Sequence, residues 1–348
     1  MIVRARAPLR ISFGGGSTDL SPYVEEQGGL VLNATIDRYA YATLRFPPEK
    51  VLRVTSLDLG TIAHFRLDEP LVGDGKHDLI TASLRRLVPQ PEELASGLEL
   101  YLETDAPPGS GLGSSSALVV AVVGALRKWR HLSLDAYQMA QLAWEIERQD
   151  VGVPGGRQDQ YAAVFGGFNF IEFRRDGGVM VNPLRVPRDT VTELEYNMLL
   201  VFTGATRTSA HIIEQQVAGY RESASGVRDA LDRIKVLAGE AKDALLTGRL
   251  ADLGAVLHED FVQRRRTASL TTPLIDEMYE EARRLGALGG KVSGAGGGGF
   301  MFLYCPFDRK PAVSEQLRAM GGQIFPITFE QEGLRSWVWN ESRLTAGG

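Results

Sequence analysis

Cysteine is nearly absent from this sequence, which has one, Cys305, among 348 residues. A single cysteine cannot form an internal disulfide, and its scarcity fits a reducing compartment. Long apolar runs are absent as well, since none reaches the roughly 18 residues that a membrane-spanning helix needs. The N-terminal residues also lack the apolar segment and cleavage site of a signal peptide. We therefore expect a cytoplasmic protein with no membrane partner.

Positive charge is not in excess either. Lysine and arginine number 38 against 43 aspartate and glutamate residues, which gives a formal net charge of -5. Proteins that bind nucleic acids usually carry a basic surface, so this class is disfavoured. The five histidines lack the spacing with cysteine or acidic residues that a zinc site needs. We expect a soluble enzyme or ligand-binding protein with no nucleic-acid partner.

What the sequence has in excess is glycine. Its 39 glycines are about 11% of the chain, against about 7% in an average protein. Much of this excess stands in three clusters, at residues 14–16, 109–113 and 294–299. The chain is long enough for two domains of roughly 150 residues or more. A change of composition near residue 190 predicts that these domains cover residues 1–190 and 191–348.

Hydrophobic periodicity predicts a mixture of strands and helices, and so an α+β fold with two domains. In the first half we expect strands at 2–7, 9–13, 30–46, 98–103, 166–173 and 179–181, and helices at 79–87, 114–130 and 133–150. In the second half we expect helices at 209–246 (interrupted), 250–266 and 273–285, and strands at 300–304 and 323–327. Thr272 and Pro273 give the last of these helices a clear N-terminal signal.

The central glycine cluster, PPGSGLGSSSA at residues 107–117, predicts an anion site. Glycine at every second position lets backbone N–H groups turn toward one point. The segment runs into a long helix, whose first N–H groups have no partners within the helix. A phosphate is the natural ligand, although the GxxxxGK[ST] pattern is absent. The alternative interpretation is a simple glycine turn before a buried helix.

The first cluster, RISFGGGSTD at residues 10–19, delivers a basic residue and then a loop rich in side-chain oxygens. A carboxylate beside two hydroxyls is suited to binding the hydroxyl groups of a sugar. The segment Ser17-Thr18-Asp19 is equally typical of the start of a helix. The residues alone do not decide between these two interpretations.

The third cluster, KVSGAGGGGF at residues 291–300, contains the G-x-G-x-x-G spacing of dinucleotide-binding proteins. That fingerprint requires a helix after the glycines. Here the residues that follow, FMFLY, predict a strand. A hydride-transferring enzyme is therefore disfavoured, but so many glycines still indicate that a ligand or another chain segment approaches this backbone closely.

Together the three clusters resemble the GHMP kinases, a family that includes galactokinase, homoserine kinase and mevalonate kinase. The resemblance extends over residues 8–306, and PPGSGLGSSSA is its most specific part. The stretches PLRISFGGGSTDL, VLNATIDRY, GGRQDQYAAVFGG, FTGATRTSA and GALGGKVSGAGGGGF are most similar to the D-glycero-D-manno-heptose 7-phosphate kinases. The fucose kinases share part of this pattern. The resemblance implies a two-domain α+β fold with the ATP and sugar site between the domains.

The resemblance also implies roles for individual residues. Asp159 matches the catalytic aspartate, and Arg10 matches the basic residue that makes the attacking hydroxyl more acidic. Ser115 and Glu147 match the Mg²⁺ ligands, although a one-residue length difference from mevalonate kinases lies between Glu147 and Asp159. The expected ATP-binding residues are Pro107, Gly109, Ser110, Gly111, Leu112, Gly113, Ser114, Ser115 and Ser116. The expected substrate-binding residues are Gly14, Gly15, Gly16, Ser17, Thr18, Asp19, Arg157, Arg207, Gly296 and Gly297.

A phosphorylated sugar needs a further cationic site for its own phosphate. Arginines in this Arg-rich chain are more often solvated surface residues, so at most two should contact that phosphate. We favour Arg207, which stands just before a predicted helix N-terminus. The other candidates are Arg157, the run 264–266 and Lys291.

The sequence thus predicts an ATP- and Mg²⁺-dependent kinase of the C1 hydroxyl of D-glycero-D-manno-heptose 7-phosphate. One alternative is a fucokinase-like enzyme acting on an unphosphorylated sugar. A second is a sugar sensor that binds without turnover. The sequence does not fix the oligomeric state, and a homodimer is compatible with it.

Overall fold

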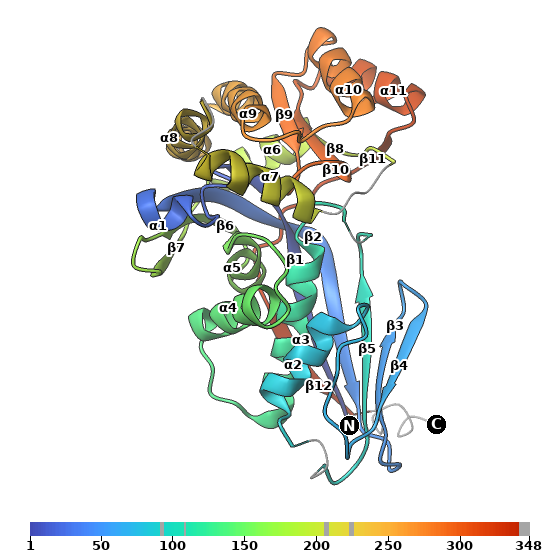
Figure 1. The fold of residues 1–348 in the computed structure, drawn as a ribbon. Coiled ribbons are helices and arrows are strands. Elements are labelled where there is room, and N and C mark those ends of the chain that lie inside the picture. Colours follow the sequence, from blue (N-terminus) through green and yellow to red (C-terminus); the bar gives the residue numbers. More distant parts are fainter. Residues whose placement is uncertain (91–93, 108, 205–208, 223–225, 341–348) are drawn as a thin grey trace, which may run out of the picture.

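The computed structural model describes residues 1–340 except 91–93, 108, 205–208 and 223–225. Its larger sheet has eight strands, in the order β12-β1-β2-β5-β3-β4, with β6 paired to β2 and β7 to β6 (Figure 1). All pairs are antiparallel except β3 with β5. The strands are β1 (Ile2–Gly14), β2 (Gly29–Arg45), β3 (Leu52–Ser56), β4 (Thr61–Phe65), β5 (Leu98–Thr104), β6 (Phe168–Phe173), β7 (Val179–Pro183) and β12 (Arg335–Trp339).

Helix α3 (Ser114–Arg130) is the central helix of the first half of the chain. It packs on β1 and β2, and its apolar residues are buried around nearly its whole circumference. Its neighbours are α2 (Asp78–Leu87), α4 (Ala136–Glu145) and α5 (Gln158–Phe165), which with α3 cover one face of the larger sheet (Figure 1). A short helix, α1 (Tyr23–Gln27), follows the first glycine cluster. The fold therefore holds the start of α3 firmly beside the end of β1.

A second sheet of four antiparallel strands, in the order β11-β8-β10-β9, lies at the other end of the molecule. Its strands are β8 (Met198–Phe202), β9 (Gly289–Val292), β10 (Phe300–Tyr304) and β11 (Gln323–Phe325). The helices of this half are α6 (Arg188–Asn197), α7 (Ser209–Arg221), α8 (Val227–Leu246), α9 (Leu250–Arg265), α10 (Pro273–Arg284) and α11 (Lys310–Ala319). The third glycine cluster connects β9 to β10, and so it reaches out from this sheet.

Most predicted elements are present, and the differences have local causes. The helix predicted at 133–150 is α4 followed by one π-helical turn, Ile146–Asp150. Asp135 caps α4 at a later start, because its side chain accepts a hydrogen bond from the Gln138 N–H. Several further elements were not predicted from the sequence, and each has ten residues or fewer: α1, α5, α6, α11, β8, β9 and β12. The predicted start of α10 is confirmed, with the Thr272 hydroxyl accepting from the Ile275 N–H.

The C-terminal strand changes the predicted domain division. Strand β12 pairs with β1, with Ile2 opposite Trp339 and Arg6 opposite Arg335. Residues 335–339 therefore lie in the first sheet, and the range 191–348 does not describe one unit. The main hydrophobic core also contains residues of the second half, such as Leu200 and Phe300. Among the described residues, no helix is long and apolar enough to cross a membrane.

The return of the chain to the first sheet depends on a close backbone crossing. Gly333 lies against the end of α5, where an added Cβ would be 2.0 Å from the Val164 carbonyl oxygen. The Leu334 N–H donates to the same carbonyl at 3.1 Å. We predict that Gly333→Ala lowers the free energy of unfolding by about 2–3 kcal/mol, because the crossing must open. Thermal or urea unfolding of the purified variant measures this.

Gly239 provides the matched control. It lies inside α8, and an added Cβ there has no atom within 4 Å. Gly239→Ala should raise the free energy of unfolding by about 0.5–1 kcal/mol, since alanine is the better helix former. Equal effects of the two substitutions would contradict the proposed crossing.

Candidate active site

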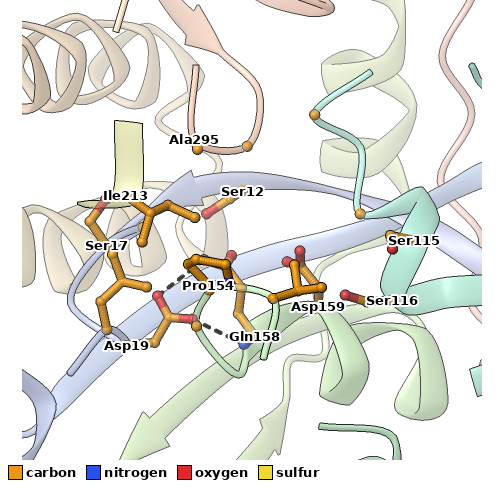
Figure 2. Close-up of a pocket in the computed structure, with 18 of the residues that line it drawn as sticks. Ser12, Ser17, Asp19, Ser115, Ser116, Pro154, Gln158, Asp159, Ile213 and Ala295 are labelled. Carbon is orange, nitrogen blue, oxygen red and sulfur yellow. Dashed lines mark hydrogen bonds between the residues drawn. The ribbon is translucent and has the colours of Figure 1, made fainter. Parts of the chain in front are cut away.

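A cavity of about 490 Å³ brings the three glycine clusters together. Figure 2 shows Ser17 and Asp19 at one side of this cavity, Ser115 and Ser116 at the other, and Asp159 between them. In the first half of the chain, the lining residues come from β1 and the loop after it, residues 109–116, the π-helical turn, and residues 153–159. In the second half they come from α7, from α9, from β9 and from the loop after β9. We call the side of Ser115 the phosphate side and the side of Asp19 the acceptor side.

The central glycine cluster forms the phosphate side. Gly109, Gly111 and Gly113 all have positive φ, at 74°, 80° and 75°. Such angles are strained for residues with a Cβ, which explains why glycine stands at each position. Helix α3 begins directly afterwards, and no side chain caps its N-terminus. Its first N–H groups and the positive end of its dipole therefore remain available to an anion at the cavity.

The third cluster braces this loop from the other half of the molecule. The Ser293 hydroxyl donates to the Gly111 carbonyl at 3.0 Å, and the Phe300 N–H donates to the Ser110 carbonyl at 2.9 Å. A Cβ on Gly111 would lie 2.3 Å from the Ser293 carbonyl oxygen, so only glycine permits this approach. The excess of glycine in both clusters is thus explained in part by packing between them.

Arg10 and Asp159 form an ion pair at the floor of the cavity. Two guanidinium nitrogens of Arg10, Nε and Nη2, lie 2.7 and 2.6 Å from the same oxygen, Oδ1, of Asp159. The third nitrogen, Nη1, donates to the Gly111 carbonyl at 2.7 Å. The other Asp159 oxygen, Oδ2, faces Gly113, and no described residue donates to it. One carboxylate oxygen is therefore fixed while the second is left to a ligand.

Asp19 holds the start of α5, the helix that carries Asp159. Its Oδ2 accepts from the backbone N–H groups of Arg157 and Gln158 at 2.9 and 3.0 Å, and the Gln158 side chain reaches Oδ1 at 3.3 Å. Burial raises the pKa of Asp19, while the backbone N–H groups act in the opposite direction. A buried carboxylate that lines the acceptor side is suited to binding hydroxyl groups there.

Glu147 lies in the π-helical turn at the phosphate side and is almost completely buried. Its Oε2 accepts from the Ser116 hydroxyl and from the Gln160 amide, each at 2.6 Å. Ser115, whose side chain is exposed, also lines the cavity. Two oxygen donors beside a phosphate site suit Mg²⁺, which commonly takes one or two protein ligands and completes its shell with phosphates and water. Among the described residues, no group of three or more His, Cys, Asp or Glu side chains is placed to hold a metal ion. A metal ion at this site would therefore need ligands from a bound phosphate as well.

The structure brings many of the predicted site residues to the cavity. From the list given in the sequence analysis these are Arg10, Gly16, Ser17, Asp19, Gly109, Gly111, Gly113, Ser114, Ser115, Ser116, Glu147 and Asp159. The cavity also contains residues that the sequence analysis did not assign to the site, namely Ser12, Leu20, Arg148, Val153, Pro154, Gly155, Gly156, Gln158, Ala210, Ile213, Gln216, Gly294 and Ala295. Of the additional phosphate candidates, Arg264 and Lys291 line it. Of the lining residues that were not assigned, Arg148, Val153, Pro154, Ile213 and Gln216 lie outside the stretches that carry the family resemblance, and no sequence pattern pointed to them. The others lie within those stretches but were not assigned to the site.

Other predicted residues are not brought to the cavity. Thr18 is fully buried and closes the turn, because its hydroxyl donates to the Gly15 and Leu30 carbonyls. The Arg157 guanidinium lies over the Trp144 ring and donates to the Gly177 carbonyl, so it contacts a different part of the surface. Gly296 and Gly297 pack on Leu270, whose carbonyl accepts from the Gly297 N–H.

The remaining predicted residues serve the loops themselves. Gly14 and Gly15 pack against α8, and the Gly15 N–H donates to Asp260. Pro107, Ser110 and Leu112 are not lining residues, and the last two are buried within the loop. Arg207 lies outside the described residues.

Comparison with known proteins agrees with this geometry. The family model "GHMP kinases N terminal domain" matches residues 78–167, and "GHMP kinases C terminal" matches residues 241–323. A D-glycero-alpha-D-manno-heptose 7-phosphate kinase of Campylobacter jejuni is 37% identical over 96% of this chain and 98% of its own. The chain belongs to the GHMP kinase family. This kinase is accordingly a phosphotransferase, and the family uses ATP as its phosphoryl donor.

Two further proteins extend the comparison of this GHMP kinase. The crystal structure of a D-glycero-D-manno-heptose 1-phosphate kinase from Bacteroides thetaiotaomicron superposes with a TM-score of 0.82 at 34% identity, covering 97% of this chain and all of that one. An L-fucokinase/L-fucose-1-P guanylyltransferase of Bacteroides fragilis is 28% identical over 87% of this chain but only 34% of its own length. The two relatives named for heptose phosphates match along nearly their whole length.

Asp19 allows a test that separates function from stability in this GHMP kinase. Asp19→Asn removes a buried charge, and the Gln158 amide can rotate to offer its oxygen to the new NH₂ group. We predict that the variant is as stable as the wild type at pH 7 or more stable, by up to about 1 kcal/mol. Its KM for the phosphoryl acceptor should rise roughly tenfold, because a charged hydrogen-bond acceptor is lost. Thermal melting and steady-state kinetics measure both effects.

The sign of the pH dependence follows from the raised pKa of Asp19. The folded state binds the Asp19 proton more tightly than the unfolded state, so the wild type gains stability as the pH falls through the folded pKa. Any advantage of the variant in melting temperature should therefore shrink from pH 7 toward pH 4. Asp189→Asn, at an exposed position of α6 outside the cavity, is the control for the loss of one carboxylate elsewhere in the chain. An advantage that grows at low pH would contradict this account.

Proposed function

We propose that this protein transfers the γ-phosphoryl group of ATP to the C1 hydroxyl of D-glycero-D-manno-heptose 7-phosphate, which yields the 1,7-bisphosphate. The observation that carries the proposal is the Arg10–Asp159 pair, which stands between an anion-binding helix start and a carboxylate suited to sugar hydroxyls. The named functions of the Campylobacter and Bacteroides relatives support a heptose phosphate as the acceptor.

In this proposal the phosphates of ATP lie along the loop from Gly109 to Ser115 and at the N-terminus of α3. Ser115 and Glu147 would hold Mg²⁺, which would neutralise phosphate charge when bound. The Ser116 and Gln160 side chains fix the orientation of the Glu147 carboxylate. The protein's main contribution is to align donor and acceptor and to stabilise the charge of the transferring group.

Asp159 accepts the proton of the attacking hydroxyl through Oδ2, the oxygen that Arg10 does not engage. The bond from oxygen to the γ-phosphorus forms as the bond from that phosphorus to the β-phosphate oxygen breaks, and ADP leaves. The Arg10 guanidinium keeps the aspartate in place and adds positive charge beside the transferring phosphoryl group. An anomeric hydroxyl is more acidic than an ordinary alcohol, so a carboxylate base is sufficient.

The reaction would supply a sugar bisphosphate for the synthesis of nucleotide-activated heptose, used in bacterial surface polysaccharide, and we propose that it takes place in the cytoplasm. A fucokinase-like activity is the second candidate, supported by the match to the Bacteroides fragilis fucokinase. Retention of Arg10, Glu147 and Asp159 around one cavity argues against a sensor without turnover.

A substrate panel tests the proposal. ADP release with Mg-ATP should be confined to D-glycero-D-manno-heptose 7-phosphate, with weaker turnover of mannose 6-phosphate, among acceptors that include mannose, fucose, galactose, mevalonate and homoserine. Preferential turnover of free fucose or mannose would favour the second candidate. Binding of sugar without ADP release from any acceptor would indicate the sensor.

A further inference from the structure

The cavity of this kinase contains a buried cation to which the proposed chemistry gives no role. Four cationic side chains line it, Arg10, Arg148, Arg264 and Lys291. Arg10 pairs with Asp159, Arg148 approaches Glu147 at 3.4 Å, and Lys291 pairs with the buried Asp260. Arg264 differs from these three, because no carboxylate in the described part of the chain lies within ion-pair distance of it.

Arg264 is nevertheless almost completely buried. Its Nη1 donates to the Val292 carbonyl at 3.3 Å and its Nη2 to the Gly294 carbonyl at 2.6 Å. Its Nε–H is buried and finds no hydrogen-bond partner among the described residues. An arginine has five N–H donors, so these two contacts leave most of its hydrogen-bonding capacity unused. Burial lowers the pKa of Arg264, which means that holding a positive charge here costs folding stability.

Lys291 lies in the same region and adds to the positive potential. Burial lowers its pKa to about 8, and the charge of Arg264 contributes in the same direction. Its single carboxylate partner, Asp260, also accepts from the Gly15 N–H. Lys291 thus has a carboxylate partner, while Arg264 beside it forms no ion pair among the described residues. An anion bound there would supply the missing counter-charge and could accept hydrogen bonds from the remaining N–H groups of Nη1 and Nη2.

The position of this cationic pair relates it to both sides of the cavity. Arg264 holds the carbonyl of Gly294, which packs against Gly111 of the phosphate loop. The charge of Asp19, on the acceptor side, acts on the pKa of Arg264 as well, in the direction that raises it. The phosphate side already has its own anion site, formed by the glycine loop and the start of α3. Among the described residues that line the cavity, Asp19 and Arg264 are the charged groups that form no ion pair.

We propose that Arg264, assisted by Lys291, binds the phosphate group that the acceptor sugar already carries. This inference rests on the proposed function and names the determinant of its substrate class. A hydroxyl-binding carboxylate and a phosphate-binding guanidinium in one cavity select a sugar phosphate over the free sugar. Arg207, which we favoured on sequence grounds, lies outside the described residues, and Arg157 contacts Trp144 instead.

The test compares a phosphorylated acceptor with its unphosphorylated analogue. Full-length wild type and Arg264→Gln are assayed for ADP release with D-glycero-D-manno-heptose 7-phosphate, with free D-glycero-D-manno-heptose, and with ATP varied. Loss of a charge-assisted hydrogen bond should raise KM for the heptose phosphate about 10- to 100-fold. KM for the free heptose and for ATP should change no more than about threefold, a difference that a purely structural role of Arg264 would not produce.

Two further variants keep the test decisive. Arg264→Lys retains the positive charge and the reach to the Gly294 carbonyl but lacks the planar guanidinium with its several N–H donors. It should therefore raise KM by an intermediate factor, and for the phosphorylated acceptor alone. This variant replaces Arg264→Gln if the latter does not fold, as judged by its melting curve. Arg265→Gln removes a neighbouring arginine that pairs with Asp276 and does not line this cavity, and it should leave all three KM values unchanged.

Each contrary outcome has its own meaning. Equal rises of KM for the phosphorylated and the free heptose would overturn the assignment of Arg264. A rise confined to ATP would assign Arg264 to the donor phosphates instead. Failure of the wild type to turn over the heptose phosphate, with turnover of another acceptor, would reject the proposed function before the variants are compared.

Discussion

The cavity depends on one guanidinium. Arg10, delivered by the long strand β1, binds Asp159 at the start of α5 and the Gly111 carbonyl of the phosphate loop at the same time. Arg10, Asp159 and Gly111 are far apart in the sequence, and without the guanidinium a half-buried carboxylate and a carbonyl would face each other. The other contacts extend the same arrangement, since Asp19 fixes the first N–H groups of α5 and Ser293 fixes Gly111 from the second sheet.

This arrangement holds charge where burial opposes it. The pKa of Asp19 is raised and those of Lys291 and Arg264 are lowered, in each case chiefly by burial. Stability alone would favour neutral residues at these positions. A site that must hold phosphates and a sugar together gains from charged groups that are already removed from water and oriented. Such groups need no reorganisation when the ligand binds. The stability lost at the site is offset by large cores elsewhere, such as the one around α3.

The sequence predicted the parts of this site that depend on local backbone chemistry. Alternating glycines before a buried helix can be interpreted without tertiary information, since positive φ and an open helix N-terminus are properties of the segment itself. Arg10, Asp19, Glu147 and Asp159 were placed through the family resemblance, and all four line the cavity.

What the sequence did not reveal depends on neighbours distant in the chain. Arg157 is two residues from Asp159, yet the Trp144 ring draws its guanidinium elsewhere. Thr18 carries the expected hydroxyl, but the Leu30 carbonyl engages it inside the core. Strand β12 has only five residues, and it forms because β1 offers an edge some 330 residues earlier in the chain. Neither the hydrophobic periodicity nor the strand propensity of residues 335–339 indicates that β1 is their partner.

The central claim is that Asp159, held by Arg10, accepts the proton of the attacking hydroxyl. The most direct test is the kcat of Asp159→Asn with Mg-ATP and heptose 7-phosphate, beside Asp189→Asn as a control with an exposed aspartate. The account predicts a loss of at least about 100-fold in kcat, with KM values within a few-fold of the wild type and a folded protein. Turnover of Asp159→Asn within a few-fold of the wild type would contradict it.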